Sequence, residues 1–332
     1  MKVKTMPSEN ACNSLTVNLT NRCNTWCRYC FQKSGSSRVD CIKTKDIQKV
    51  LEFFEKKQHG GEKYIQLTGG EPFLHPDIFE IIKLALSFSY TLRIQTNGIL
   101  LNRMTEEQMI ILSSDKILIK VSLDGWNVET HERWRAKGSF VKVISGIERL
   151  RKYNRNIGIK TVIHDLNFSE IYRMLDMCLD LGARAFSYNQ LRPEGRAERL
   201  RFGHKSIGER EIIEKLLPYF KKKKYQPLLN GTWIMRYYRR ILEGSDVLKN
   251  PEGFYIDYDG GIYPNQSCSE NERIGSIFGG SFSEEFDFNK LIPEEISISS
   301  DVLEIVSKFL GNSLIIKKKG NRKSWNQTSK KK

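Results

Sequence analysis

The run Asn21-Arg-Cys-Asn-Thr-Trp-Cys-Arg-Tyr-Cys-Phe31 places three cysteines within eight residues. Cys23, Cys27 and Cys30 follow the spacing C-x3-C-x2-C, so a single loop can direct three thiolates at one site. A structural zinc takes four ligands, and a [4Fe–4S] cluster usually takes four cysteines. A site closed by three thiolates leaves one metal position open for a substrate or cofactor. The alternatives are a zinc site with a distant fourth ligand and unconnected core cysteines.

Short apolar runs and helical patterns alternate on either side of this loop. Strands are expected at residues 15–19, 64–68, 92–95, 117–121, 157–163 and 184–188. Helical patterns lie between them, for example at residues 44–58, 140–153 and 168–181. Strands that alternate with helices are typical of a parallel sheet with right-handed crossovers. We therefore expect an α/β fold, a partial (β/α)6 TIM-like barrel with a small C-terminal α+β extension.

Polar and glycine-rich loops follow the expected strands. The loops after the second to the sixth strand start, in that order, with the runs Gly69-Gly-Glu-Pro72, Thr96-Asn-Gly98, Ser122-Leu-Asp-Gly125, His164-Asp165 and Leu191-Arg-Pro193. In α/β barrels the chemistry takes place on the loops at the carboxyl ends of the strands. Every unusual loop of this sequence lies at that end, which favours an active site there.

These features together resemble the radical SAM (S-adenosylmethionine) superfamily over residues 15 to about 200. The cysteine spacing resembles the family's cluster motif, and Gly69-Gly-Glu-Pro72 resembles its second-strand motif. The resemblance implies one [4Fe–4S] cluster held by the three cysteines, with SAM bound to the fourth iron. One electron passed to SAM would break a C–S bond, and the resulting 5′-deoxyadenosyl radical would abstract a hydrogen atom from the substrate.

The second-strand loop is expected to bind the methionine part of SAM. Without Cβ atoms, Gly69 and Gly70 would let main-chain carbonyls approach the ammonium group of SAM. Glu71 would add negative charge near that cation, and Pro72 would fix the turn. The alternative for this loop is an ordinary turn between a strand and a helix, which Gly and Pro favour in any protein.

Further contacts with SAM are expected from the other loops. By the same resemblance, Tyr29 would lie beside the adenine, and Leu191 would contact it from the end of the sixth strand. Asn97, Ser122 and Asp124 would hydrogen-bond to the ribose or the methionyl group. The alternatives are an exposed loop aromatic for Tyr29, turn chemistry for the polar residues and a core position for Leu191.

The remaining histidines and cysteines are assigned less specific roles. His75 precedes a Pro and is interpreted as part of a capping loop rather than a zinc ligand. His164 is interpreted as half of a satisfied loop pair, with a position facing the substrate as the alternative. Cys178 lies in a helix-spaced apolar stripe and is expected to be a buried structural thiol. The roles of Cys12 and Cys41 stay open.

A hairpin is expected at residues 254–264, around Asp259-Gly260. It resembles the SPASM or twitch extension of peptide-modifying radical SAM enzymes, in which a Tyr-Pro-Cys run binds a second cluster. Here Asn265 follows Pro264, and the nearest thiol is Cys268. We therefore expect no auxiliary cluster. Cys268 is interpreted as a stray thiol or, alternatively, as a catalytic hydrogen-atom donor to a substrate radical, as in radical SAM peptide epimerases.

The expected organisation has four parts. An N-terminal segment, residues 1–14, precedes the radical SAM partial barrel at residues 15–225. The extension without a cluster follows at residues 226–316, and a basic disordered tail at residues 317–332. The net charge of +15 includes eight basic residues in that tail. The charge therefore does not by itself indicate nucleic acid, and no apolar stretch is long enough to span a membrane. An odd number of cysteines and an oxygen-sensitive cluster motif favour the cytoplasm.

The favoured function is an oxidoreductase- or isomerase-type radical SAM enzyme that modifies a ribosomally synthesised peptide. A radical SAM enzyme of cofactor or small-metabolite biosynthesis and a zinc-stapled nucleic-acid-binding module are the alternatives. The expected partners are the peptide and a reductant such as flavodoxin or ferredoxin. Only 14 residues precede the first strand, so a leader-peptide-binding domain would have to be a separate protein.

Overall fold

The computed structural model describes residues 14–35, 41–57, 63–200, 207–220, 222–229, 248–249, 255–263, 275–277 and 295–296. Cys12, Cys268 and the basic tail, residues 317–332, lie outside the described residues.

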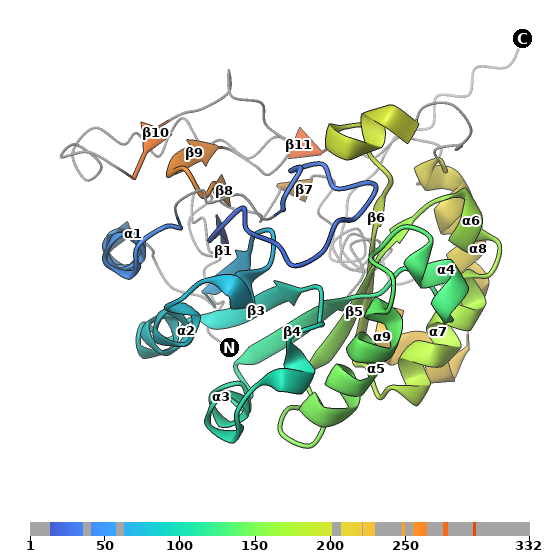
Figure 1. The fold of residues 1–332 in the computed structure, drawn as a ribbon, viewed down its shortest axis with the longest axis horizontal. Coiled ribbons are helices and arrows are strands. Elements are labelled where there is room, and N and C mark those ends of the chain that lie inside the picture. The colour runs from blue at the N-terminus through green and yellow to red at the C-terminus, as the bar shows by residue number, and fades with distance from the viewer. Residues whose placement is uncertain are drawn as a thin grey trace, which may run out of the picture.

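Six parallel strands form the centre of the fold (Figure 1). They are β1 (Ser14–Asn18), β2 (Tyr64–Thr68), β3 (Thr91–Thr96), β4 (Ile117–Ser122), β5 (Ile157–Ile163) and β6 (Ala185–Gln190). Each strand pairs in parallel with the next one along the chain. The structure thus confirms the α/β fold with a partial TIM-like barrel that the sequence predicts.

Helices lie on the outer side of the curved sheet (Figure 1). The α-helices are α1 (Thr44–Lys57), α2 (Ile78–Ser87), α3 (Glu106–Ile111), α4 (Val128–Glu132), α5 (Ser139–Leu150), α6 (Asp165–Phe168), α7 (Ile171–Asp180), α8 (Glu209–Phe220) and α9 (Gln226–Leu229). The described residues also include the 3-10 turns η1 (Pro72–Leu74), η2 (Leu101–Arg103), η3 (Gly195–Leu200) and η4 (Lys223–Tyr225). In the described part of the chain, no helix has the length and apolar character needed to cross a membrane.

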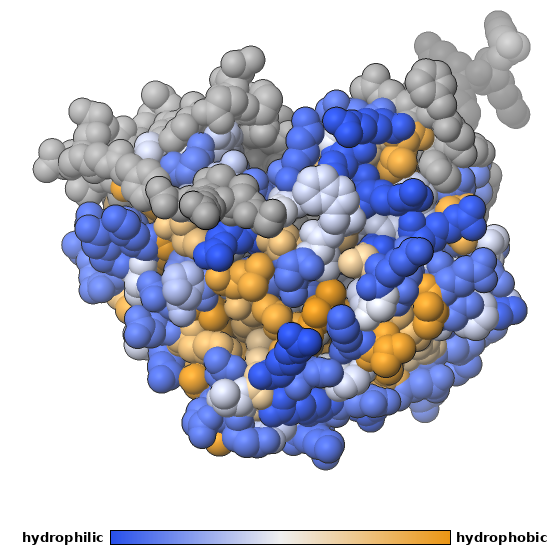
Figure 2. Space-filling model, viewed as in Figure 1, coloured by the Kyte–Doolittle hydropathy of each residue, from blue (hydrophilic) through white to orange (hydrophobic). Residues whose placement is uncertain are grey.

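The two faces of the sheet differ in polarity, and this difference positions the site. On β3, Leu92 and Ile94 are fully buried, whereas the alternate residue Gln95 is only partly buried. Because side chains alternate along a strand, one face packs on the helices and the other faces the inside of the barrel. Gln95 lines a cavity together with Ser122 and Lys160. Figure 2 shows hydrophilic residues around the edge of the viewed face and apolar ones nearer its middle.

The hairpin predicted at residues 254–264 is present over the described residues 255–263, but it joins the barrel in a way the sequence did not indicate. Strands β8 (Tyr255–Ile256) and β9 (Gly261–Tyr263) pair antiparallel, and β10 (Gly275–Ser276) pairs with β9. Strand β8 also pairs in parallel with β1, so the three strands extend the barrel sheet at its β1 edge. A separate two-stranded sheet joins β7 (Leu248–Lys249) to β11 (Glu295–Ile296).

Candidate active site

The loop between β1 and α1 brings its three thiols to one cavity. Cys23, Cys27 and Cys30 all line this cavity, which lies at the carboxyl ends of the strands. The Thr25 hydroxyl lies 3.1 Å from the Cys23 Sγ and 3.7 Å from the Cys27 Sγ. Burial raises the pKa of both of these thiols above the ordinary value. The loop therefore holds one buried and one partly buried sulfur close to the same hydroxyl group.

The glycines of the second-strand loop line the same cavity and pack tightly against the cysteine loop. A Cβ on Gly70 would lie 2.4 Å from the Arg22 carbonyl oxygen, and one on Gly69 would lie 2.6 Å from the Thr20 carbonyl oxygen. The Gly70 amide donates to the Thr20 carbonyl at 2.6 Å. Close packing against the cysteine loop thus explains why these two positions are glycine. The expected approach of their backbone to SAM stays a prediction.

Glu71 is fully buried between the loops that follow β2 and β3. Its carboxylate accepts hydrogen bonds from the Asn97 amide at 2.7 Å and the Thr96 hydroxyl at 2.8 Å. Burial raises its pKa to about 7, although these hydrogen bonds oppose the rise. Pro72 begins η1 and is buried. Neither Glu71 nor Pro72 is among the described residues that line the cavity, so their expected roles toward SAM stay predictions.

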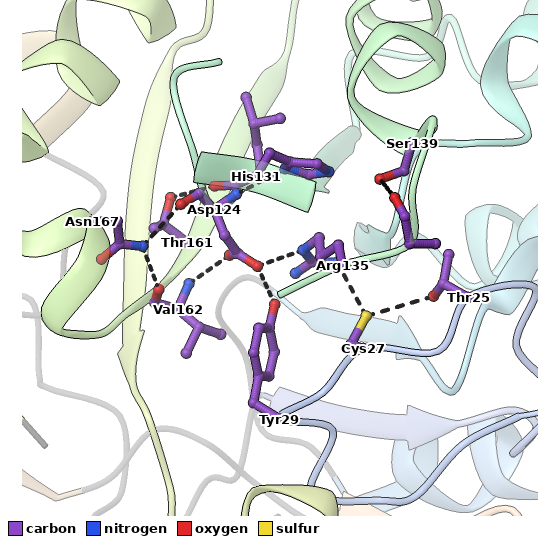
Figure 3. Close-up of polar contacts among 12 residues, drawn as sticks. Thr25, Cys27, Tyr29, Asp124, His131, Arg135, Ser139, Thr161, Val162 and Asn167 are labelled. Atoms are coloured by element: carbon purple, nitrogen blue, oxygen red, sulfur yellow. Dashed lines mark hydrogen bonds and ion pairs between the residues drawn. The ribbon is translucent and has the colours of Figure 1, made fainter. Parts of the chain in front are cut away.

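Asp124 links three elements around the cysteine loop (Figure 3). It accepts hydrogen bonds from the Tyr29 hydroxyl, from the Arg135 guanidinium and, at 2.9 Å, from the Val162 amide. Burial opposes ionisation of this carboxyl, but Arg135 and the hydrogen bonds outweigh burial and hold its pKa below the ordinary value. Tyr29 and Arg135 line the cavity, and Asp124, which does not line it, fixes both side chains by hydrogen bonds.

The other predicted SAM-contacting residues lie at the cavity. Asn97, Ser122 and Leu191 line it from the ends of β3, β4 and β6. The Asn97 side-chain amide lies 3.8 Å from the Cys23 Sγ and donates to the Asn24 side chain at 2.7 Å. The structure therefore brings the thiols and most of the predicted residues to one cavity.

Arg135 is a site residue that the sequence did not reveal. One guanidinium nitrogen lies 3.9 Å from the Cys27 Sγ, and the side chain also pairs with Asp124. It follows α4, eleven positions after Asp124, and no local pattern distinguishes it among the 54 lysines and arginines of the chain. Lining residues that were also missed include Gln95, Lys160, Asn189, Arg192 and Arg196.

His75, His164 and the two described cysteines outside the loop, Cys41 and Cys178, have structural surroundings. The Nε2 of His75 hydrogen-bonds to the Ile42 carbonyl at 2.7 Å. The Nδ1 of His164 accepts from the Leu166 amide at 3.2 Å and so caps α6. Cys178 is fully buried on α7, and burial raises its pKa. The Cys41 thiol donates to the Thr20 hydroxyl at 3.2 Å.

The donor set at the cavity fits an iron–sulfur cluster. Among the described residues, no group of three or more His, Cys, Asp or Glu side chains is placed to hold a metal ion as it stands. A cluster spreads its thiolates more widely than a single ion does. Hydroxyl, amide and guanidinium donors from Thr25, Asn97 and Arg135 lie near the sulfurs of Cys23 and Cys27. Such donors stabilise thiolate ligands and tune a bound cluster.

Comparisons with known proteins agree with this geometry. The profile of the radical SAM superfamily matches residues 17–178. Among curated proteins, the chain is 30% identical over 182 residues to the antilisterial bacteriocin subtilosin biosynthesis protein AlbA of Bacillus subtilis, covering 54% of this chain and 40% of AlbA. It is 33% identical over 190 residues to the AdoMet-dependent heme synthase of Methanosarcina barkeri, covering 57% and 53%. The chain spans about half the length of these curated relatives.

A solved structure shows the same fold over most of the chain. The protein anSMEcpe, with bound AdoMet and a peptide, superposes with a TM-score of 0.66. The sequences are 19% identical, and the match covers 84% of this chain and 81% of anSMEcpe. At this identity the likeness concerns the fold alone.

Proposed function

Because residues 17–178 belong to the radical SAM superfamily, we propose that the chain binds one [4Fe–4S] cluster and SAM and uses them to modify a peptide. The observation that supports this most directly is the single cavity lined by Cys23, Cys27, Cys30, Gly70 and Ser122. Cluster motif and second-strand motif are far apart in the sequence, yet their backbones are in direct contact. The family assignment replaces the alternative of a zinc-stapled nucleic-acid module.

The described residues would serve this chemistry by holding and shielding the reactants. Bound together, cluster and SAM supply a one-electron cleavage of a C–S bond and the abstraction of a hydrogen atom. Arg135 places positive charge beside the Cys27 sulfur, and Asp124 fixes the guanidinium in that position. Tyr29 closes one side of the cavity and is held by Asp124. Ser122 and Asn97 offer hydrogen-bonding groups at the ends of neighbouring strands.

A ribosomally synthesised peptide is the substrate we favour. AlbA is named for bacteriocin biosynthesis, and anSMEcpe has been solved with a bound peptide. The hairpin of β8 and β9, which the sequence likens to the SPASM or twitch extension, agrees with this class of substrate. The modification would be of the oxidoreductase or isomerase type. Cys268 lies outside the described residues, and its role as hydrogen-atom donor stays a prediction.

Small-metabolite biosynthesis is the second candidate, because a heme synthase is among the relatives at 33% identity. A short precursor-peptide gene beside the gene for this chain would favour the peptide substrate. The reaction also needs a reductant such as flavodoxin or ferredoxin. We infer a cytoplasmic location from the oxygen sensitivity of the cluster.

Anaerobic reconstitution tests the proposal. With dithionite as reductant, the reconstituted chain should be brown and should release 5′-deoxyadenosine from SAM. Mass spectrometry of candidate precursor peptides then identifies the product: loss of two hydrogens indicates a crosslink, gain of a methylene a methylation, and an unchanged mass an epimerisation. Cys27→Ser should abolish SAM cleavage, whereas Cys178→Ala, the matched control on α7, should retain it. Equal cleavage by Cys27→Ser and the unsubstituted chain would refute the proposal.

A further inference from the structure

The cysteine loop, residues 21–35, exposes a tryptophan next to a buried thiol. Trp26 is 65% exposed, whereas the following residue, Cys27, is 9% exposed. Tryptophan brings a large apolar surface, and tryptophans that contact other proteins often dominate the binding energy. The exposed indole of Trp26 is therefore a candidate contact for another protein.

The indole of Trp26 is held in a fixed orientation although it is exposed. The Arg196 guanidinium lies over its ring, 4.0 Å from the ring centroid. That guanidinium is itself anchored, because it donates to the Cys27 carbonyl at 2.8 Å and the Ser34 carbonyl at 2.7 Å. On the inner side, a Cβ on Gly35 would lie 3.0 Å from the indole. A rigid aromatic side chain loses little conformational entropy when a partner covers it.

The exposed charged residues of the cysteine loop itself all have the same sign. Residues 21–35 contain Arg22, Arg28 and Lys33 and no acidic residue, and all three basic side chains are exposed. On the neighbouring η3, one exposed glutamate and one exposed arginine offset each other. The loop therefore exposes one large apolar side chain and three positive charges. A partner complementary to this surface is acidic.

The proposed function requires an electron from outside for each SAM cleaved, and electron transfer slows steeply with distance. A donor must therefore dock where the cysteine loop meets the surface. We propose that Trp26, Arg22, Arg28 and Lys33 form the docking surface for a small acidic electron-carrier protein. This inference rests on the proposed function. One electron passes from the reduced centre of the carrier to the oxidised cluster, and no bond or proton is exchanged. Encounters of this kind use small interfaces and depend on charge for their rate.

The test compares a protein donor with a chemical one. The reconstituted holoprotein is reduced by flavodoxin hydroquinone or by dithionite, and the bleaching of cluster absorbance gives a rate for each. In Arg28→Glu/Lys33→Glu, the ratio of the flavodoxin rate to the dithionite rate should fall about tenfold at low salt. The fall should shrink at about 1 M salt, where surface charges are screened. Lys142→Glu/Lys152→Glu, with the same charge change on and after α5, should leave the ratio unchanged.

An unchanged ratio in Arg28→Glu/Lys33→Glu, or an equal fall in the control, would overturn the docking surface. A variant that folds less well would slow cluster reduction by both donors alike. The ratio of the two rates therefore stays informative for such a variant. As a second readout, titration calorimetry of flavodoxin on the holoprotein should show weaker binding to Trp26→Ala. Cluster reduction is measured without SAM. A wild-type chain that is reduced but does not cleave SAM would therefore refute the proposed function while leaving this inference standing.

Discussion

Glu71 is a carboxylic acid that the fold buries completely inside a ring of donors. Burial raises its pKa from 4.5 to about 7, and the Asn97 amide, the Thr96 hydroxyl and the Phe73 amide oppose part of this rise. At a pH between these two pKa values, Glu71 keeps its proton in the folded state, whereas in the unfolded chain it has released it. The free energy of unfolding attributable to Glu71 therefore falls as the pH rises through this window, and the loss is complete above it.

Substitution of Glu71 by glutamine should remove this pH dependence. In the apoprotein, the stability of Glu71→Gln relative to the unsubstituted chain should rise between about pH 5 and about pH 8, by up to about 3 kcal/mol. The constant cost of losing charge-assisted hydrogen bonds does not alter the slope. Urea denaturation at several pH values measures both proteins. A stability difference that stays level across this range would contradict the raised pKa.

Gly70 allows two loops to touch through their backbones. In Gly70→Ala, the new methyl group would meet the Arg22 carbonyl oxygen at 2.4 Å and its carbon at 2.8 Å. Backbone atoms cannot move aside cheaply, so we expect a loss of about 1–3 kcal/mol in the free energy of unfolding and a lower iron content after reconstitution. In the control Gly208→Ala the nearest atom of Glu211 is 3.8 Å away, and the change should be within about 0.5 kcal/mol. Equal melting temperatures for the two variants would contradict the clash.

At the scale of elements, η3 secures the cysteine loop from the end of β6. Gly195 has a φ of +62°, and a Cβ there would lie 2.2 Å from the Phe31 carbonyl oxygen. The Arg196 amide donates to the Cys30 carbonyl at 3.0 Å, and its side chain reaches two further carbonyls of the loop. The cysteine loop is thus ordered partly by a segment more than 150 residues away in the sequence.

Substitution of Arg196 should loosen the cluster rather than unfold the barrel. Arg196→Met would leave the Cys27 and Ser34 carbonyls without this donor, at a cost of about 1–3 kcal/mol each while they remain buried. We expect less iron after anaerobic reconstitution and several-fold faster bleaching by a chelator, with unchanged circular dichroism. Arg199→Met on the same η3 is the matched control. Wild-type iron content and bleaching in Arg196→Met would show that η3 does not secure the loop.

The elements that the sequence predicts well are those specified by local pattern. The apolar runs at residues 64–68 and 157–163 are β2 and β5 as the structure has them. The sixth strand was expected to end at residue 188, but it continues to Gln190 because Asn189 and Gln190 pair with the end of β5. The helix expected at 168–181 begins only at Ile171, because His164 caps a separate short helix before it. Pairing with another strand decided the first boundary, and a local cap decided the second.

The site follows the same division. The three cysteines were identified because their ligand spacing lies within a single loop. Arg135 was not, since its contact with Cys27 exists only after α4 has folded onto the cysteine loop. Glu71 was assigned to SAM from its motif, and this role stays a prediction; the structure adds hydrogen bonds to its carboxylate from Phe73, Thr96 and Asn97 that the motif did not indicate. Residue type predicts what a side chain can do, but long-range packing decides which way it faces.

At the scale of the whole molecule, the hairpin and the barrel share one sheet and one core. Val17 of β1 pairs with Ile256 of β8, and Ile256 and Ile262 belong to the same apolar cluster as the barrel strands. The Tyr255 hydroxyl accepts hydrogen bonds from Asn18 at 3.1 Å and from Gln32 of the cysteine loop at 2.9 Å. These contacts favour a single cooperative unit across the expected boundary at residues 225 and 226.

Removal of a buried side chain from the hairpin tests this cooperativity. Ile256 is 1% exposed, so Ile256→Ala should lower the free energy of unfolding by about 2–5 kcal/mol through the transfer and cavity terms. If the hairpin and the barrel unfold together, hydrogen exchange of amides in β3 and β4 should accelerate as much as exchange in β8. The exposed substitution Val141→Ala on α5 should change neither. Faster exchange confined to β8 and β9, with β3 and β4 at their wild-type rates, would instead mean that the extension is an independent domain.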